Sequence, residues 1–310
     1  PTRGPSAVPG QNAYTTNLLR PYRGLSTIQR QTTEFWDTYH SLQFTLNRRY
    51  RDGFAFGVNY TRGLSFKGNT GLQKRLQHNA DGSVSIRADQ ADYEKLNENL
   101  DLRPNVIKAN ALFDVPDVPG TSDGAMRALG YLTNDWQISG VFTATSGTAF
   151  DIGFAYQTNG TSQNLTGSPD YGARIIYTGD PGSGCSSDQY KQFDTAVVTG
   201  PQYGSVGLES GRNRLRGCMD KRVDMALAKN IRLGGARNLQ FRMDVFNLFN
   251  TYIYSARNST VSYASPTNLT VQNGQFNADG TLNQARVLPR NAGFGAVTGA
   301  NNLGGEVGLG

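Results

Sequence analysis

An alternating pattern on both sides of one short turn constrains the fold of this chain more than any other feature. Between Tyr39 and Ser65, apolar side chains occupy every second position, and mostly small polar side chains fill the positions between them. Because side chains of a strand point alternately to its two faces, the pattern predicts two strands with one apolar and one polar face. Arg51-Asp52-Gly53 separates them and suits a tight hairpin, which needs residues that tolerate a positive φ. Each arm has about ten residues, the length of a tilted strand that crosses a bilayer.

The composition agrees with a β-rich chain that has long polar loops. The 310 residues include 37 Gly, 15 Tyr and 15 Phe, and only 17% are charged. The mean hydropathy is −0.49, and the sequence has no run of about 18 apolar residues, which excludes a transmembrane helix. A membrane location stays open, because a barrel strand exposes apolar side chains on only one of its faces.

The net charge of +6 gives no sign of a nucleic-acid-binding module. The basic residues are scattered and are not interleaved with stacking aromatic residues, so we expect no nucleic-acid partner. They are expected instead at loops and strand ends, facing water or lipid headgroups.

The residues that commonly carry chemistry are sparse. His40 and His78 are the only histidines, they lack metal-ligand spacing, and no Gly-x-Ser-x-Gly motif accompanies them. The acidic residues between Asp81 and Glu98 lack the spacing of a calcium loop. We therefore expect no catalytic residue, no cofactor and no metal site.

Cys185 and Cys218 are the only cysteines, and they flank a segment rich in Gly and Ser. A pair that brackets one long loop predicts a single disulfide formed in an oxidising compartment. Two free thiols are the alternative.

Further alternating segments predict strands over 103–115, 136–145, 223–231 and 239–245, a short strand near Tyr252–Ala256 and a short helix within Ala88–Leu102. The first 37 residues are expected to form a loop.

The connections are short at 51–53, long at 66–102, of medium length at 116–135, long at 151–221, short at 234–238 and long at 251–284. Short turns at one side and long loops at the other are typical of an antiparallel up-and-down transmembrane β-barrel. A soluble sandwich with Greek-key links has no reason to alternate in this way.

Five polar residues of the last two predicted long strands are expected to face the lumen: Asp224, Asn230, Gln240, Arg242 and Asp244.

Several segments, in order, resemble the barrel of Oar-like TonB-dependent receptors. They are Leu19-Arg20-Pro21-Tyr22, the hairpin arm from Tyr39 to Tyr50, Gly57–Thr61, Trp136–Val141, Gly211–Gly217 and Phe246-Asn247-Leu248-Phe249-Asn250. The resemblance implies a plugged transporter of about 22 strands in the outer membrane of a Gram-negative bacterium. In such a barrel, the five polar residues expected to face the lumen either hydrate the interior and hydrogen-bond the plug, or some of them contact a substrate in transit. It implies active uptake of a scarce nutrient, coupled to the TonB-ExbB-ExbD complex. We expect the loop that contains Cys185 and Cys218 to face outward and to take part in ligand recognition.

The sequence also departs from that family's pattern. The plug domain, the TonB box, a signal peptide and the closing strand with its terminal aromatic residue are missing, so we expect residues 1–310 to be the C-terminal portion of a barrel domain. Roughly six or seven strands cannot close such a barrel alone. The alternative function is a structural or adhesive β-rich surface protein that binds partners through its long loops.

Overall fold

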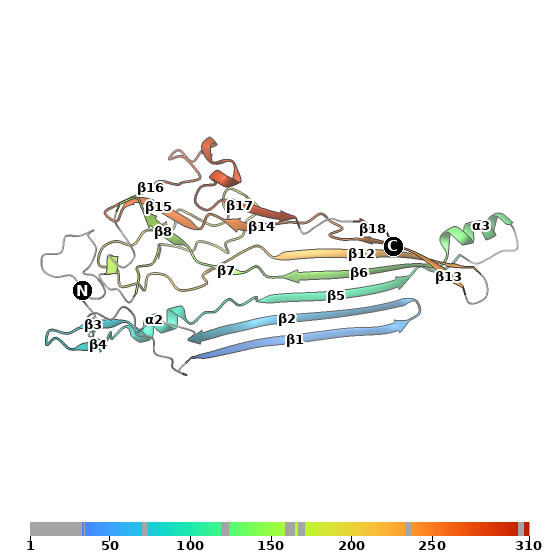
Figure 1. Ribbon diagram of the computed structural model, residues 1–310, viewed down its shortest axis with the longest axis horizontal. Coiled ribbons are helices and arrows are strands. Elements are labelled where there is room, and N and C mark those ends of the chain that lie inside the picture. Colours follow the sequence, from blue (N-terminus) through green and yellow to red (C-terminus); the bar gives the residue numbers. More distant parts are fainter. Residues whose placement is uncertain are drawn as a thin grey trace.

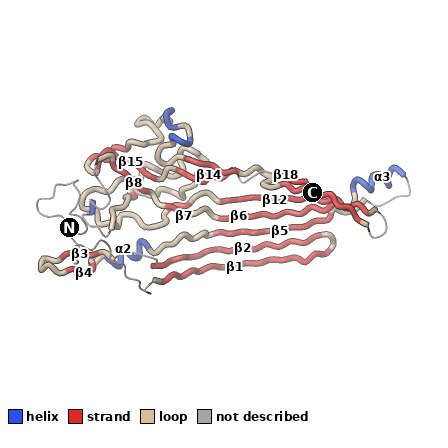
Figure 2. The backbone as a smooth tube through the Cα atoms, in the orientation of Figure 1, coloured by secondary structure: helices blue, strands red, loops and turns tan. Residues whose placement is uncertain are grey.

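The computed structural model describes residue 33 and residues 35–69, 74–118, 124–158, 165–166, 171–233, 237–302 and 307–309. Its largest element is a long sheet, and the long connections gather at one end of its strands (Figures 1 and 2). The predicted loop over residues 1–37 lies mostly outside the described residues, although Trp36 and Asp37 belong to the first strand.

Seven antiparallel strands form the sheet, in the order β1-β2-β5-β6-β12-β13-β18. They are β1 (Trp36–Arg51), β2 (Phe54–Asn69), β5 (Asn105–Asp114), β6 (Trp136–Thr145), β12 (Asp220–Arg232), β13 (Asn238–Val245) and β18 (Val307–Leu309). Each strand pairs with the next sheet strand along the chain, which is the up-and-down order. The hairpin and the strands predicted from alternation are confirmed.

The register of the sheet joins the alternating patterns of separate strands into two continuous faces. One row of paired residues is apolar: Leu46, Val58, Ala109, Phe142 and Val223. The next row points to the other face and is mostly polar or small: Asn47, Gly57, Asn110, Val141 and Asp224. The apolar face is open, with Phe44 and Leu46 58% and 62% exposed. Because burial of apolar surface is the main favourable term in folding, this face needs an apolar environment outside the chain.

The short connections lie at one end of the sheet. The turn between β1 and β2 places Asp52 at φ 53° and Gly53 at φ 76°, the left-handed conformation that a tight hairpin requires. Residues 234–236 of the predicted turn between β12 and β13 lie outside the described residues. The connection of medium length contains helix α3 (Gly124–Thr133), which was not predicted.

Smaller elements occupy the connection between β2 and β5. Helix α2 (Gln90–Asn97) confirms the short helix predicted within Ala88–Leu102. The hairpin of β3 (Leu76–His78) and β4 (Val84–Ile86) was not predicted, because three-residue strands are too short to show a period.

The long loop predicted over 151–221 folds with the segment after β14 (Tyr252–Arg257) into a compact cap, defined here as the described parts of residues 149–216 and 258–296. Its elements are β7 (Ala149–Phe150), β8 (Gly153–Tyr156), β9 (Ile176–Tyr177), β10 (Val198–Thr199), β11 (Leu215–Arg216), β15 (Thr260–Ser265), β16 (Asn268–Val271), η1 (Gln284–Arg286) and η2 (Pro289–Asn291). β14 confirms the short strand predicted near Tyr252.

The cap has its own hydrophobic core, made of Ile152, Ile175, Phe193, Val198, Leu215, Val261, Tyr263 and Phe294. Strands β8 and β15, more than 100 residues apart in sequence, pair in parallel within it. No pairing was predicted within these long loops, and the antiparallel arrangement predicted for the sheet is unaffected. A parallel pair needs a long connection, and here the whole of β12, β13 and β14 lies between the two strands.

The sheet is open. Among the described residues, no strand pairs with the outer edge of β1 or of β18. The C-terminal residues, where we expected no closing strand, contain β17 (Val297–Asn302), which pairs with β14, and β18, which pairs with β13. No described helix is long and apolar enough to span a bilayer.

Candidate functional site

A cavity of about 810 Å³ lies where the cap meets the region around α2. Acidic and basic side chains both line it, together with backbone and neutral polar groups. The lining comprises Lys67, Asp92, Lys95, Leu96, Glu98, Asn99, Tyr177, Glu209, Ser210, Gly211, Arg212, Asn213 and Arg214. These residues come from the end of β2, from α2 and the residues that follow it, and from two parts of the cap.

Hydrogen bonds fix the two main walls to each other. The backbone N–H of Arg212 donates to the carbonyl oxygen of Leu96 at 3.2 Å, and Nδ2 of Asn213 donates to the carbonyl oxygen of Asn99 at 2.8 Å. Lys67 forms an ion pair with Glu98, which ties the end of β2 to the same wall. These contacts hold the walls of the cavity in place relative to each other.

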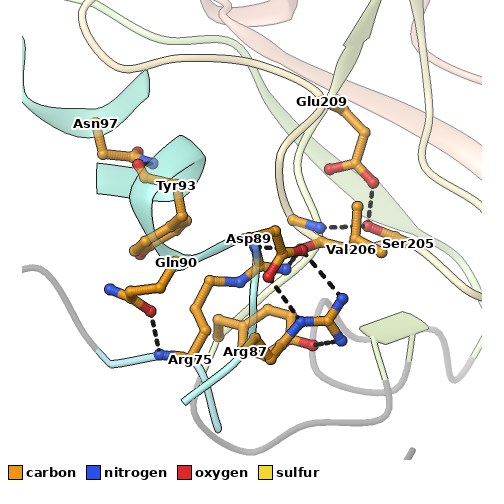
Figure 3. A network of polar contacts seen from close by, with 11 residues as sticks. Arg75, Arg87, Asp89, Gln90, Tyr93, Asn97, Ser205, Val206 and Glu209 are labelled. Carbon is orange, nitrogen blue, oxygen red and sulfur yellow. Dashed lines mark hydrogen bonds and ion pairs between the residues drawn. The ribbon is translucent and has the colours of Figure 1, made fainter. Parts of the chain in front are cut away.

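Behind this junction lies a network centred on Arg75 (Figure 3). The Arg75 side chain is fully buried, and its Nη1 lies 3.0 Å from Oδ2 of Asp89 in an ion pair. Its guanidinium also lies 4.4 Å from the ring centroid of Tyr171 and 5.3 Å from that of Tyr93. Nη2 donates to the carbonyl oxygen of Val206. The cation thus joins the start of α2 to the cap.

Asp89 is shared by two arginines. Arg87 donates to both of its carboxylate oxygens, at 2.9 and 3.0 Å. These hydrogen bonds, followed by the positive charge of Arg75, lower the pKa of the Asp89 carboxyl below its ordinary value. The carboxylate is therefore ionised at neutral pH and holds both guanidinium groups.

Glu209 and Tyr177 line the cavity, and each has a polar side-chain atom that is shielded from solvent. Ser205 donates to Oε1 of Glu209, whereas Oε2 is buried and has no hydrogen-bond partner among the described residues. Burial, followed by the negative charge of Asp151, raises the pKa of Tyr177 to about 12. The phenol is thus protonated at neutral pH and can donate a hydrogen bond.

The predicted disulfide is confirmed. Cys185 and Cys218 are joined, with their Cα atoms 4.9 Å apart. The bond connects the cap to the residues that lead into β12.

The five residues predicted to face a lumen share the polar face of β12 and β13. The register pairs Asn230 with Gln240, and it places Arg242 and Asp244 opposite alanines of β12. Arg242 forms an ion pair with Asp244 at 2.9 Å, and Asp224 forms one with Arg222 at 2.9 Å. Gln240 donates to Asn230 at 2.9 Å. That this face lines a lumen stays a prediction.

None of these five residues lines the cavity at the cap, and sequence reasoning missed the residues that do. The acidic residues between Asp81 and Glu98 were considered only as a calcium loop, and Arg212 and Arg214 were treated as part of the scattered basic residues. Only the opposite charges of segments 92–98 and 209–214 could have indicated that the two pack together. Among the described residues, no three His, Cys, Asp or Glu side chains form a group that could hold a metal ion.

The comparison with known families agrees with the two-faced sheet. Residues 3–302 match the family model described as an outer membrane beta barrel domain. No curated protein and no solved structure matches the chain. The match spans nearly all of the chain, so this protein belongs to the outer membrane β-barrel domain family and is located in the bacterial outer membrane.

Proposed function

We propose that this chain is the C-terminal portion of the barrel of an Oar-like TonB-dependent receptor, which takes up a scarce nutrient actively. In this proposal the apolar face of the sheet contacts outer-membrane lipid and the polar face lines the lumen. The cap is the outward-facing surface that first binds the ligand. The TonB-ExbB-ExbD complex would act through a plug domain outside residues 1–310. The proposal assigns no catalytic step, cofactor or nucleic-acid partner to the chain.

The cavity between the cap and the α2 region carries this proposal. Outer-membrane barrels have short turns on the periplasmic side and long loops on the outer side, so the cap end is the outer end. A cavity of about 810 Å³ is large enough for a small nutrient. Its wall carries acidic and basic side chains, among them Glu209 and Arg212. Such groups orient a polar ligand before it enters the lumen.

The open edges of the sheet support the proposal that this chain forms a portion of a larger barrel. Lipid-exposed sheet edges do not occur in a membrane, because unpaired backbone groups are costly there. We therefore expect further strands of the same barrel to pair with the outer edges of β1 and β18.

The test measures what the protein removes from the medium. Cells that lack the protein and cells that carry it are grown in limiting medium, with and without a protonophore, and the medium is analysed by mass spectrometry. We expect one or more compounds to be depleted only with the protein present and only without the protonophore. Glu209→Gln should reduce this depletion, whereas the control Asp52→Asn, in the turn at the opposite end, should not.

The adhesive alternative rests on the separate core of the cap, which would suit a module that binds a macromolecule. Depletion that is absent or indifferent to the protonophore, together with protein-dependent attachment of cells to a surface, would support that function instead. Heat-modifiable migration of the protein on a gel, with recovery only in detergent, is expected under both functions, because both use the outer-membrane barrel.

A further inference from the structure

Helix α3 is attached to the apolar side of the sheet at the short-turn end. The indole Nε1 of Trp136 donates to the carbonyl oxygen of Leu132 at 2.7 Å. Nζ of Lys229 donates to the carbonyl oxygen of Asn134. Trp136 of β6 pairs with Lys229 of β12. This pair lies on the same face as the apolar pair Ile138 and Leu227, which is two residues away along each strand. The last turn of α3 therefore lies on the side of the sheet that faces lipid.

Hydrogen bonds and an ion pair hold the connection that contains α3 to the sheet. Asn134 accepts from the backbone N–H of Val118 at 2.8 Å and donates to its carbonyl oxygen at 3.1 Å. The N–H of Asp135 donates to the side chain of Asp117 at 2.9 Å, and Asp135 forms an ion pair with Arg232 at 2.8 Å. The two ends of the connection that carries α3 are thus fixed to each other and to β12.

The last turn of α3 exposes large apolar side chains. Tyr131 and Leu132 are 69% and 72% exposed. Leu233, at the end of β12, is exposed at the same end of the sheet. In water such a group of side chains is unfavourable, whereas it continues the apolar face that already contacts the membrane.

The neighbouring charges mark this level as the boundary between lipid and water. The Lys229 ammonium lies 5.4 Å from the Trp136 ring centroid, and the Arg48 guanidinium lies 5.3 Å from that of Phe54. Aromatic rings with basic side chains beside them are typical of the headgroup level of a bilayer. The α3 sequence contains one arginine and no acidic residue, which suits a surface of anionic headgroups.

We infer that α3 is an interfacial anchor that lies in the headgroup region of the periplasmic leaflet, with Tyr131 and Leu132 inserted among the phospholipid chains. A barrel connection on this side usually needs only a short turn, so a ten-residue helix fixed to the lipid-facing side calls for such a role. The helix would hold the barrel at a fixed depth in the membrane.

The disulfide makes a direct test simple. Because both native cysteines are joined, a single introduced cysteine can be labelled selectively with a polarity-sensitive fluorophore. Leu132→Cys carries the label at the proposed anchor. Asp52→Cys is the matched control, in a turn at the same end with a side chain that is 76% exposed. The full-length protein is reconstituted in vesicles of phosphatidylethanolamine and phosphatidylglycerol, and heat-modifiable migration confirms folding of both variants.

Lipids with a quencher near the headgroup should quench the label at position 132 at least about twofold more than the label at position 52, and iodide in the water should do the reverse. Equal responses at both positions would overturn the inference. Protection from iodide without quenching by lipid would also overturn it, because a protein surface, such as a plug domain, would then cover α3.

Discussion

The carboxylate of Asp89 lies 3.0 Å from Nη1 of Arg75, whose side chain is fully shielded from solvent. Arg75 also contacts residues of the cap, so this ion pair connects the α2 region to it. Removing one member of a buried pair leaves an uncompensated charge, at a typical cost of about 3–5 kcal/mol.

Asp89→Asn should therefore loosen α2 and the wall of the cavity. We expect faster hydrogen exchange of the α2 amides, equivalent to a local loss of about 3 kcal/mol. Asp81→Asn is the control, because the hydrogen bonds that its side chain accepts from described residues come from Ser83 in the same exposed turn. Unchanged exchange in Asp89→Asn would show that the pair does not hold the helix.

Acid should produce a similar effect in the unmodified protein. Because the folded-state pKa of Asp89 is depressed, its contribution to stability is complete above the ordinary pKa and is lost as the pH falls through the lower folded-state value. We expect protection of the α2 amides to decrease as the pH is lowered below about 4, after correction for intrinsic exchange rates. In Asp89→Asn this pH dependence should largely disappear.

The two faces of the sheet should respond oppositely to a charge. Phe44 stacks on Tyr60 on the apolar face, whereas the neighbouring Thr45 donates to Asn59 at 3.0 Å on the polar face. Phe44→Arg should destabilise the protein in vesicles by about 2–4 kcal/mol, and Thr45→Arg by about 1 kcal/mol or less. Urea-induced unfolding from vesicles measures both values. Equal losses would contradict the assignment of the faces.

The disulfide should stabilise the cap and leave the sheet unaffected. Cys185 and Cys218 are 33 residues apart, and closing a loop of that size stabilises by about 2–4 kcal/mol. Replacing both with serine should make the cap sensitive to protease, with a protected fragment that retains β1 to β6. Reductant should sensitise the unmodified protein and have no effect on the double variant.

A side chain at Gly147, where the chain enters the cap, should destabilise the protein. A Cβ atom at this position would lie 2.3 Å from the carbonyl oxygen of Gly217, on the segment that leaves the cap. Gly147→Ala must therefore separate the two segments, and we expect a loss of about 1–3 kcal/mol in thermal or urea unfolding. Gly140→Ala is the matched control within β6, because its nearest neighbour would be 3.6 Å away. A similar loss in both variants would show that strand propensity, and not the close approach, decides the cost.

The sheet could be predicted from the sequence because each long strand shows the alternation of apolar and polar residues within its own sequence. Residues such as Phe44, Phe56 and Phe142 occupy one face whatever their neighbours are, and the register then only aligns patterns that already agree. The lengths of the connections also predicted that the short turns lie at one end of the strands and the long loops at the other.

The cap and its cavity could not be predicted in this way. Ile152, Phe193 and Phe294 meet in one core but lie far apart in Gly-rich sequence that has no period. The cavity likewise combines charges from three distant segments, and tertiary packing alone brings them together. Helix α3 was missed because a ten-residue helix without a recognised cap resembles an ordinary connection.

The parallel ladder between β8 and β15 has a mechanical consequence. Thr260 to Tyr263 pair in register with Gly153 to Tyr156, so the two loops of the cap share one set of backbone hydrogen bonds. Neither loop can swing alone without breaking that ladder. Any displacement of one of the two loops must therefore displace the other as well.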